Sequence, residues 1–111
     1  MQLSQEKTPR ISMTWPQLRR NEFTLRGRPV RLEPQTMKVF AVLYMNLGRV
    51  VRVEDLIEGV WPNPELEPDY STNVIYQKIH NLRRHLSEEL EHLWGRGYIL
   101  AHPSKWKGDP K

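Results

Sequence analysis

Hydrogen-bonding side chains recur at helical spacing in the stretch TNVIYQKIHNLRRHL, residues 72–86. Five of them would share the side of a helix opposite its apolar stripe: Asn73, Gln77, His80, Asn81 and Arg84. Asn and Gln match the hydrogen-bonding edge of adenine in the major groove of DNA, and Arg matches that of guanine. We therefore predict that these five side chains read base pairs, although an ordinary solvated face would have a similar composition.

Side chains suited to phosphate flank that row. No Asp or Glu, which DNA phosphates would repel, occurs from residue 72 to residue 87. Hydroxyl and cationic groups are the usual protein contacts to the DNA backbone. The residues that we expect to hold phosphates, on this helix and on a later hairpin, are Thr72, Tyr76, Lys78, Arg83 and Arg96.

An apolar stripe predicts the helix that carries the row. Its members stand at i, i+4, i+7 and i+11, within about 60° on a helical wheel: Ile75, Ile79, Leu82 and Leu86. The pattern predicts a helix over about residues 71–86, with Asp69, Ser71 or Thr72 as its cap.

Two further helices are predicted before it. Apolar residues at three- and four-residue steps indicate a central helix over residues 34–47, which Gly48 ends. A shorter helix follows, with acidic residues in its first turn and this apolar stripe: Leu56, Ile57, Val60 and Trp61. The next segment, PNPELEP, has three prolines in seven residues and is predicted to be a loop. We expect Trp15 and Trp61 to lie in the core or at its edge.

Strand patterns occupy the two ends of this helical region. Phe23 and Leu25 alternate with polar residues, as do Val30 and Leu32, so residues 11–32 predict a small antiparallel sheet that turns at Arg26-Gly27. After the third helix, LEHLWGRGYIL predicts a hairpin over residues 90–101. Together the elements predict an α+β fold. It is a winged helix-turn-helix with an N-terminal antiparallel sheet, three helices and a C-terminal β-hairpin wing.

We predict one domain over residues 11–102, between a flexible leader, 1–10, and a basic flexible tail, 103–111. The net charge is +4, yet six of the 13 acidic residues and none of the 17 basic ones fall in residues 54–69. Such segregation favours a polyanionic partner for the rest of the chain. The acidic segment itself is explained either by helix-start charges and a solvated loop, or by contact with a protein.

Several classes of protein are excluded. There is no cysteine, and the four histidines lack metal-ligand spacing, so we expect no metal and no other cofactor. No catalytic set is recognisable, and we predict that the protein is not an enzyme. No apolar run approaches the roughly 20 residues of a membrane span, and the N-terminus lacks a signal peptide. We expect a cytoplasmic protein that does not bind membranes.

Four landmarks in order resemble the effector domain of OmpR/PhoB-type response regulators over residues 11–102. They are LEPQTMKVF, then GRVVRVEDL followed by Trp61, then TNVIYQKIHNLRRHL, and last LWGRGYIL. The resemblance implies a bacterial or phage-like DNA-binding regulator of transcription. It also implies that the loop between the second and third helices contacts RNA polymerase, through Pro64, Glu65, Glu67 and Asp69.

The chain departs from that family at informative positions. Trp94 and Ile99 replace two wing arginines, and we expect Arg96 to take over their role. Arg52 stands where a serine usually caps the second helix, which predicts a weaker cap. We expect a stand-alone domain without a receiver domain, to which phosphorylation-driven dimerisation does not carry over. The oligomeric state stays open, with a dimer on DNA as one arrangement.

The leading prediction is a sequence-specific regulator that binds double-stranded DNA, reads the major groove with the third helix and uses the hairpin as a wing. The alternative is a winged-helix interaction module that binds RNA polymerase or another regulator without specific DNA readout. The missing wing arginines are the best support for that alternative.

Overall fold

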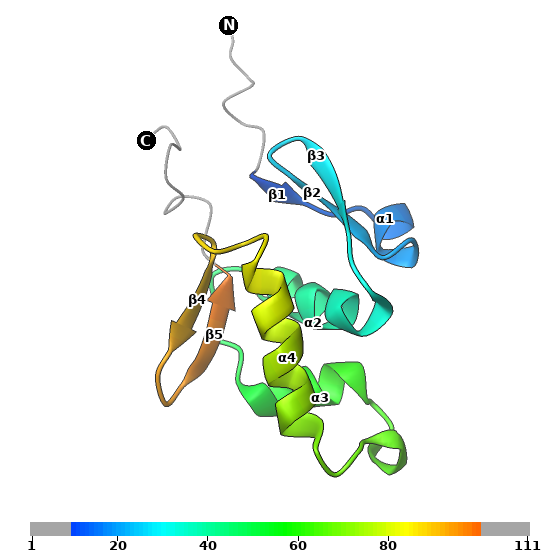
Figure 1. Ribbon diagram of the computed structural model, residues 1–111, viewed down its shortest axis with the longest axis vertical. Coiled ribbons are helices and arrows are strands. Elements are labelled where there is room, and N and C mark those ends of the chain that lie inside the picture. The colour runs from blue at the N-terminus through cyan, green and yellow to red at the C-terminus, as the bar shows by residue number, and fades with distance from the viewer. Residues whose placement is uncertain (1–9, 101–111) are drawn as a thin grey trace, which may run out of the picture.

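A bundle of three helices forms the centre of the molecule, between a small sheet and a hairpin (Figure 1). The computed structural model describes residues 10–100. The bundle consists of α2 (Pro34–Met45), α3 (Val53–Val60) and α4 (Ser71–Arg83). The predicted winged helix-turn-helix fold is confirmed. The predicted leader and tail, apart from Arg10, lie outside the described residues.

The N-terminal sheet contains β1 (Ile11–Ser12), β2 (Glu22–Leu25) and β3 (Arg28–Arg31), all antiparallel and in that order. Arg26 and Gly27 both have positive φ, 51° and 83°, which suits the tight turn of a twisted hairpin. The sheet packs on the bundle through Phe23, whose ring stacks on Phe40 of α2 at 4.2 Å between centroids.

A short helix, α1 (Trp15–Arg19), lies between β1 and β2 and was not among the three predicted helices. A capping box starts it. The Gln17 N–H donates to the Thr14 hydroxyl at 3.2 Å, and the Thr14 N–H donates to Gln17 Oε1 at 3.0 Å. None of its residues is buried, and Trp15 is 65% exposed, so the prediction that Trp15 lies in the core or at its edge is wrong. Trp61 is half-buried at the core edge, as predicted.

The third helix begins at Ser71, as predicted, but it ends earlier than predicted and has a different cap. It ends at Arg83, although all four stripe residues, including Leu86 beyond its end, are buried. Tyr70 occupies the N-cap position and its side chain makes no capping hydrogen bond. None of the three predicted residues therefore caps the helix. Ser71 lies buried in the first turn, where its hydroxyl donates to Glu67 at 2.7 Å.

The loop PNPELEP contains one turn of 3₁₀ helix, η2 (Pro64–Leu66), which Asn63 caps. Before it, α3 carries Glu54 and Asp55 in its first turn, as predicted. The weaker cap expected at Arg52 is partly offset, since the Arg52 N–H donates to the Asp55 carboxylate at 3.2 Å.

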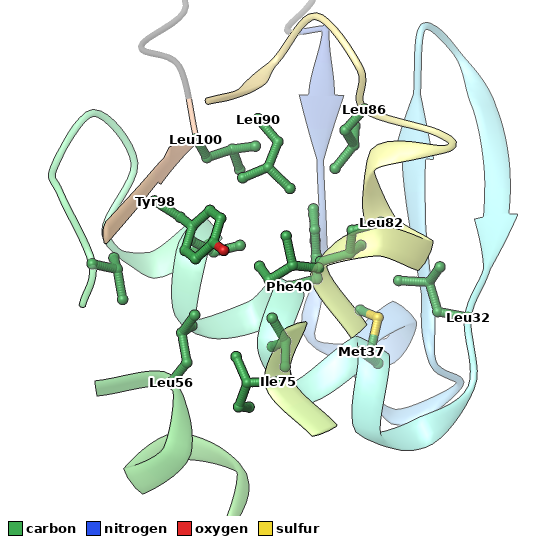
Figure 2. Close-up of a cluster of buried hydrophobic side chains, with 14 of the residues drawn as sticks. Leu32, Met37, Phe40, Leu56, Ile75, Leu82, Leu86, Leu90, Tyr98 and Leu100 are labelled. Atoms are coloured by element: carbon green, nitrogen blue, oxygen red, sulfur yellow. The ribbon is translucent and has the colours of Figure 1, made fainter. Parts of the chain in front are cut away.

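The C-terminal hairpin pairs β4 (Leu90–Leu93) with β5 (Gly97–Leu100). Two backbone hydrogen bonds fix the hairpin to the bundle at Val51. The Val51 N–H donates to the Tyr98 C=O at 2.7 Å, and the Tyr98 N–H donates to the Val51 C=O at 2.8 Å. Below it, one hydrophobic core combines side chains from the sheet, the three bundle helices and the hairpin (Figure 2). No helix among residues 10–100 has the length and apolar character that crossing a membrane requires.

An ion-pair cluster joins the sheet to the turn between α4 and β4. The Glu89 side chain is completely buried, and its Oε2 accepts from Arg26 at 2.9 Å and from Arg10 at 3.3 Å. Glu88 lies 3.4 Å from the same Arg10 guanidinium but is half-exposed. Charged contacts from two distant segments therefore hold the end of the third helix and the start of the hairpin.

Candidate nucleic-acid interface

The five residues of α4 that are predicted to read bases form a row that is largely open to solvent. Asn73, Gln77, His80 and Arg84 are exposed, and Asn81 is partly buried. Arg84 follows the last helical residue but keeps helical dihedrals, φ −63° and ψ −31°, so its guanidinium continues the row. Of the flanking residues, Thr72, Tyr76 and Arg83 are also exposed. Side chains from four turns of one helix thus share a face without a carboxylate.

Lys78 lies apart from this exposed face. Its side chain is only 14% exposed, and its ammonium donates to the carboxylate of Glu33, the N-cap residue of α2. Glu33 also accepts from the Thr36 hydroxyl at 2.9 Å. These two hydrogen bonds, that from Lys78 first, hold the pKa of Glu33 below its ordinary value. The Lys78 charge is therefore already engaged in joining α4 to α2.

A groove of about 440 Å³ separates α4 from the hairpin. Its polar lining comes from three elements, namely Thr72 and Tyr76 of α4, Arg52 and Glu54 at the start of α3, and Arg96 of the hairpin turn. Arg52 was considered in the sequence only as a weak cap. Its side chain is 65% exposed beside Asp55, at 3.5 Å, and surface pairs of this kind are weak. Arg52 therefore joins the candidate site, although it was not among the predicted DNA contacts.

Tyr98 forms the wall of this groove on the hairpin side. Burial raises the pKa of its phenol, the nearby Tyr76 raises it further, and Arg83 opposes the change. The phenol therefore stays neutral in the physiological range. Tyr76 of α4 and Tyr98 of β5 line this groove together.

The hairpin turn carries an aromatic and a cationic side chain. Trp94 and Arg96 are both exposed, on either side of Gly95, and Gly95 and Gly97 have φ of 75° and 142°. The predicted turn is confirmed. The Trp94 ring lies 4.2 Å from the ring of His92, which stacks on Tyr98 at 4.6 Å. In the sequence Trp94 stood out only as a departure from the family pattern.

The acidic loop lies on the side of α4 away from the hairpin (Figure 1). Its four predicted contact residues, Pro64, Glu65, Glu67 and Asp69, are all exposed. Leu66 and Tyr70, which were not among the predicted contact residues, are exposed beside them. Glu67 accepts the hydrogen bond from Ser71, so its carboxylate also serves the start of α4.

Comparisons with known proteins relate this geometry to one family. Residues 27–100 match the family described as transcriptional regulatory protein, C terminal. The transcriptional regulator HilA of Salmonella typhi is 32% identical over 81 residues, which cover 68% of this chain and 14% of HilA. The chain thus spans a small part of the length of that relative.

Solved structures agree on the fold. The DNA-binding domain of E. coli CadC superposes with a TM-score of 0.65 at 22% identity, over 86% of this chain and 94% of that domain. The DNA-binding domain of CpxR from E. coli gives 0.60 at 25% identity, over 78% and 87% of the two chains.

Proposed function

This chain belongs to the family of C-terminal domains of transcriptional regulatory proteins, and on that premise we propose that it reads specific sequences of double-stranded DNA. The family and the fold are those of DNA-binding transcription regulators rather than of enzymes. In the proposed complex α4 lies in the major groove and the hairpin β4–β5 acts as a wing. We extend the proposal to a cytoplasmic location, because DNA is the ligand.

The exposed row on α4 is the observation that supports base reading most directly. Asn73, Gln77 and Arg84 carry the groups that bind adenine and guanine edges, and they project from one face. His80 and the partly buried Asn81 complete the proposed set. Because no carboxylate interrupts this face, it can approach phosphates on both sides of the groove without repulsion.

Backbone contacts are proposed for the exposed residues beside the row. They are Thr72, Tyr76, Arg83 and Arg96, with Arg52 added because it faces the same groove. Lys78 would have to leave Glu33 to hold a phosphate, so we propose that it contributes less to DNA affinity than Arg83 does.

The acidic loop supports a second partner. We propose that Pro64, Glu65, Glu67 and Asp69 contact RNA polymerase, because DNA would repel this loop and it faces away from the wing. The exposed Leu66 and Tyr70 add the apolar area that protein interfaces use.

Selection of bound duplexes from a random pool tests the proposal. We expect one motif or a repeated motif, the latter indicating two copies on DNA. Arg84→Ala should then weaken binding to the selected duplex by about 1–3 kcal/mol and relax one base preference, as measured by fluorescence anisotropy. Arg19→Ala, which removes an exposed arginine from α1, is the matched control and should bind normally.

Two results would contradict specific reading. One is unchanged discrimination between selected and random duplexes in both Arg84→Ala and Gln77→Ala. The other is an affinity of about 10⁻⁴–10⁻⁶ M on every sequence, which is the nonspecific range. The second result, together with capture of RNA polymerase in the presence of nuclease, would favour the interaction-module alternative.

A further inference from the structure

Trp94 is the most exposed large apolar side chain among residues 10–100, at 85%. An indole is among the largest apolar groups that a protein can bury, and here folding buries little of it. The core below the hairpin is complete without it, since Leu90, Tyr98 and Leu100 fill that space (Figure 2). The fold therefore does not explain a tryptophan at this position.

The indole nevertheless packs against a neighbouring ring. Its ring lies 4.2 Å from His92 with planes tilted by 44°, and His92 stacks nearly parallel on Tyr98 at 4.6 Å and 17°. Tyr98 is fixed to Val51 by two backbone hydrogen bonds. Three rings thus connect the bundle to the wing tip. Because this contact restricts the indole, less conformational entropy is lost when the indole binds a partner.

The charges beside the indole favour a polyanion. Arg52 and Arg96 line the adjoining groove with the hydroxyl groups of Thr72 and Tyr76, against the single carboxylate of Glu54. Glu91, the acidic residue of β4, alternates with His92 along the strand and so projects to the other face of the hairpin. Arg52 has only the weak surface pair with Asp55, so both guanidinium groups remain available to a polyanion, whereas an apolar protein partner would offer them no counter-charge.

The turn itself is open to close approach. A Cβ placed on Gly95 would meet no heavy atom of residues 10–100 within 4 Å, so none of these residues covers this side of the turn. A sugar-phosphate backbone could lie directly against the peptide there, as it often does against glycine.

The position of the wing then indicates which part of DNA the indole meets. The major groove is about 12 Å wide, so a hairpin beside a helix in that groove crosses the bordering strand to the next minor groove. We propose that Trp94 enters this minor groove as an apolar wedge against deoxyribose and base edges, and that the groove beside α4 takes the intervening phosphodiester. This inference rests on the proposed reading of DNA by α4.

The test compares wild-type protein with Trp94→Ala and Trp94→Phe on the selected duplex. Trp94→Ala should weaken binding by about tenfold, within the range of one aromatic stack on a nucleotide, and Trp94→Phe should retain most of the affinity. Trp15→Ala is the matched control, because Trp15 is exposed but lies outside the groove. Thermal melting should be unchanged in all three variants, since both indoles are largely exposed.

Inosine substitution in the DNA distinguishes a contact in the minor groove from contacts elsewhere on the duplex. Replacing flanking G·C pairs by I·C removes the guanine amino group from the minor groove and leaves the major-groove edge intact. This change should strengthen binding of the wild-type protein several-fold and leave Trp94→Ala unaffected. An equal response in both proteins, or an affinity of Trp94→Ala within twofold of wild type, would overturn the inference while the reading by α4 stands. Failure of every variant and of the wild type to bind a selected motif would instead overturn the proposed function.

Discussion

Lys78 and Glu33 stand 45 residues apart in the sequence and form an ion pair across two helices. The helical period correctly predicted which residues of α4 face the core, and four of the five residues predicted to face outward are exposed, because this depends on local geometry alone. It did not predict that Lys78, on the flank, would be mostly buried beside α2. A partner contributed by the N-terminus of another helix is invisible to a periodic pattern.

Ionisation of Glu33 makes the contribution of the Glu33–Lys78 pair to the free energy of unfolding depend on pH. Its pKa is lowered, mainly by the Lys78 hydrogen bond and then by Thr36, so the folded state favours the ionised form. The pair therefore contributes its full stability above about pH 5, and this contribution is lost as the pH falls through the lowered pKa. We expect Glu33→Gln to flatten the acid side of the stability curve, as urea midpoints from pH 3 to 7 would show. Glu58→Gln, at an exposed position of α3, should keep the wild-type slope.

A comparison of Arg83 with Lys78 tests whether one binds DNA phosphate while the other stabilises the fold. If Arg83 holds a phosphate, Arg83→Gln should reduce the slope of log K against log salt concentration by about 1. Lys78→Gln should change that slope much less and should instead lower the urea midpoint, because it leaves Glu33 without its partner. Equal changes of the slope in the two variants would show that Lys78 exchanges Glu33 for DNA on binding.

At the scale of elements, the length of a helix determined whether the sequence pattern predicted it. The three bundle helices have 12, 8 and 13 residues, enough for an apolar stripe to be recognised. The five-residue α1 has no such stripe, and only its Thr14-x-x-Gln17 capping box indicated it. Trp15 was misplaced for the same reason, since an aromatic residue is usually buried unless its element lies outside the core.

The attachment of the wing gives a prediction for Gly97. A Cβ there would collide with the Val51 carbonyl, and φ of 142° is unfavourable for any other residue. Gly97→Ala should destabilise the protein by about 2–3 kcal/mol through backbone strain and loss of the Val51–Tyr98 bridge. Gly95→Ala has only the positive φ of 75° to accommodate, so it should cost about 1 kcal/mol. Chemical denaturation would measure both, and equal losses would contradict a close contact at Val51.

At the scale of the whole molecule, the Glu89 cluster joins segments whose pairing no local pattern predicts. Arg10 and Glu89 are 79 residues apart, and Arg26 and Glu89 are 63 apart. In the sequence, Glu88 and Glu89 were only two acids after a helix, and nothing distinguished them. The fold buries one and exposes the other. A buried carboxylate is tolerated only when it is paired, so its two arginines become part of the structure that supports the wing.

Replacing these neighbouring acids should therefore have unequal effects. Glu89→Gln keeps the shape but removes the charge that Arg10 and Arg26 face, and we expect a loss of about 1–3 kcal/mol. Glu88→Gln removes a half-exposed carboxylate near the same two arginines and should cost less than about 1 kcal/mol. Urea denaturation at neutral pH would measure the difference. Equal small losses would mean that the sheet is held by the Phe23–Phe40 contact and the core, and that the cluster adds little to the coupling between sheet and wing.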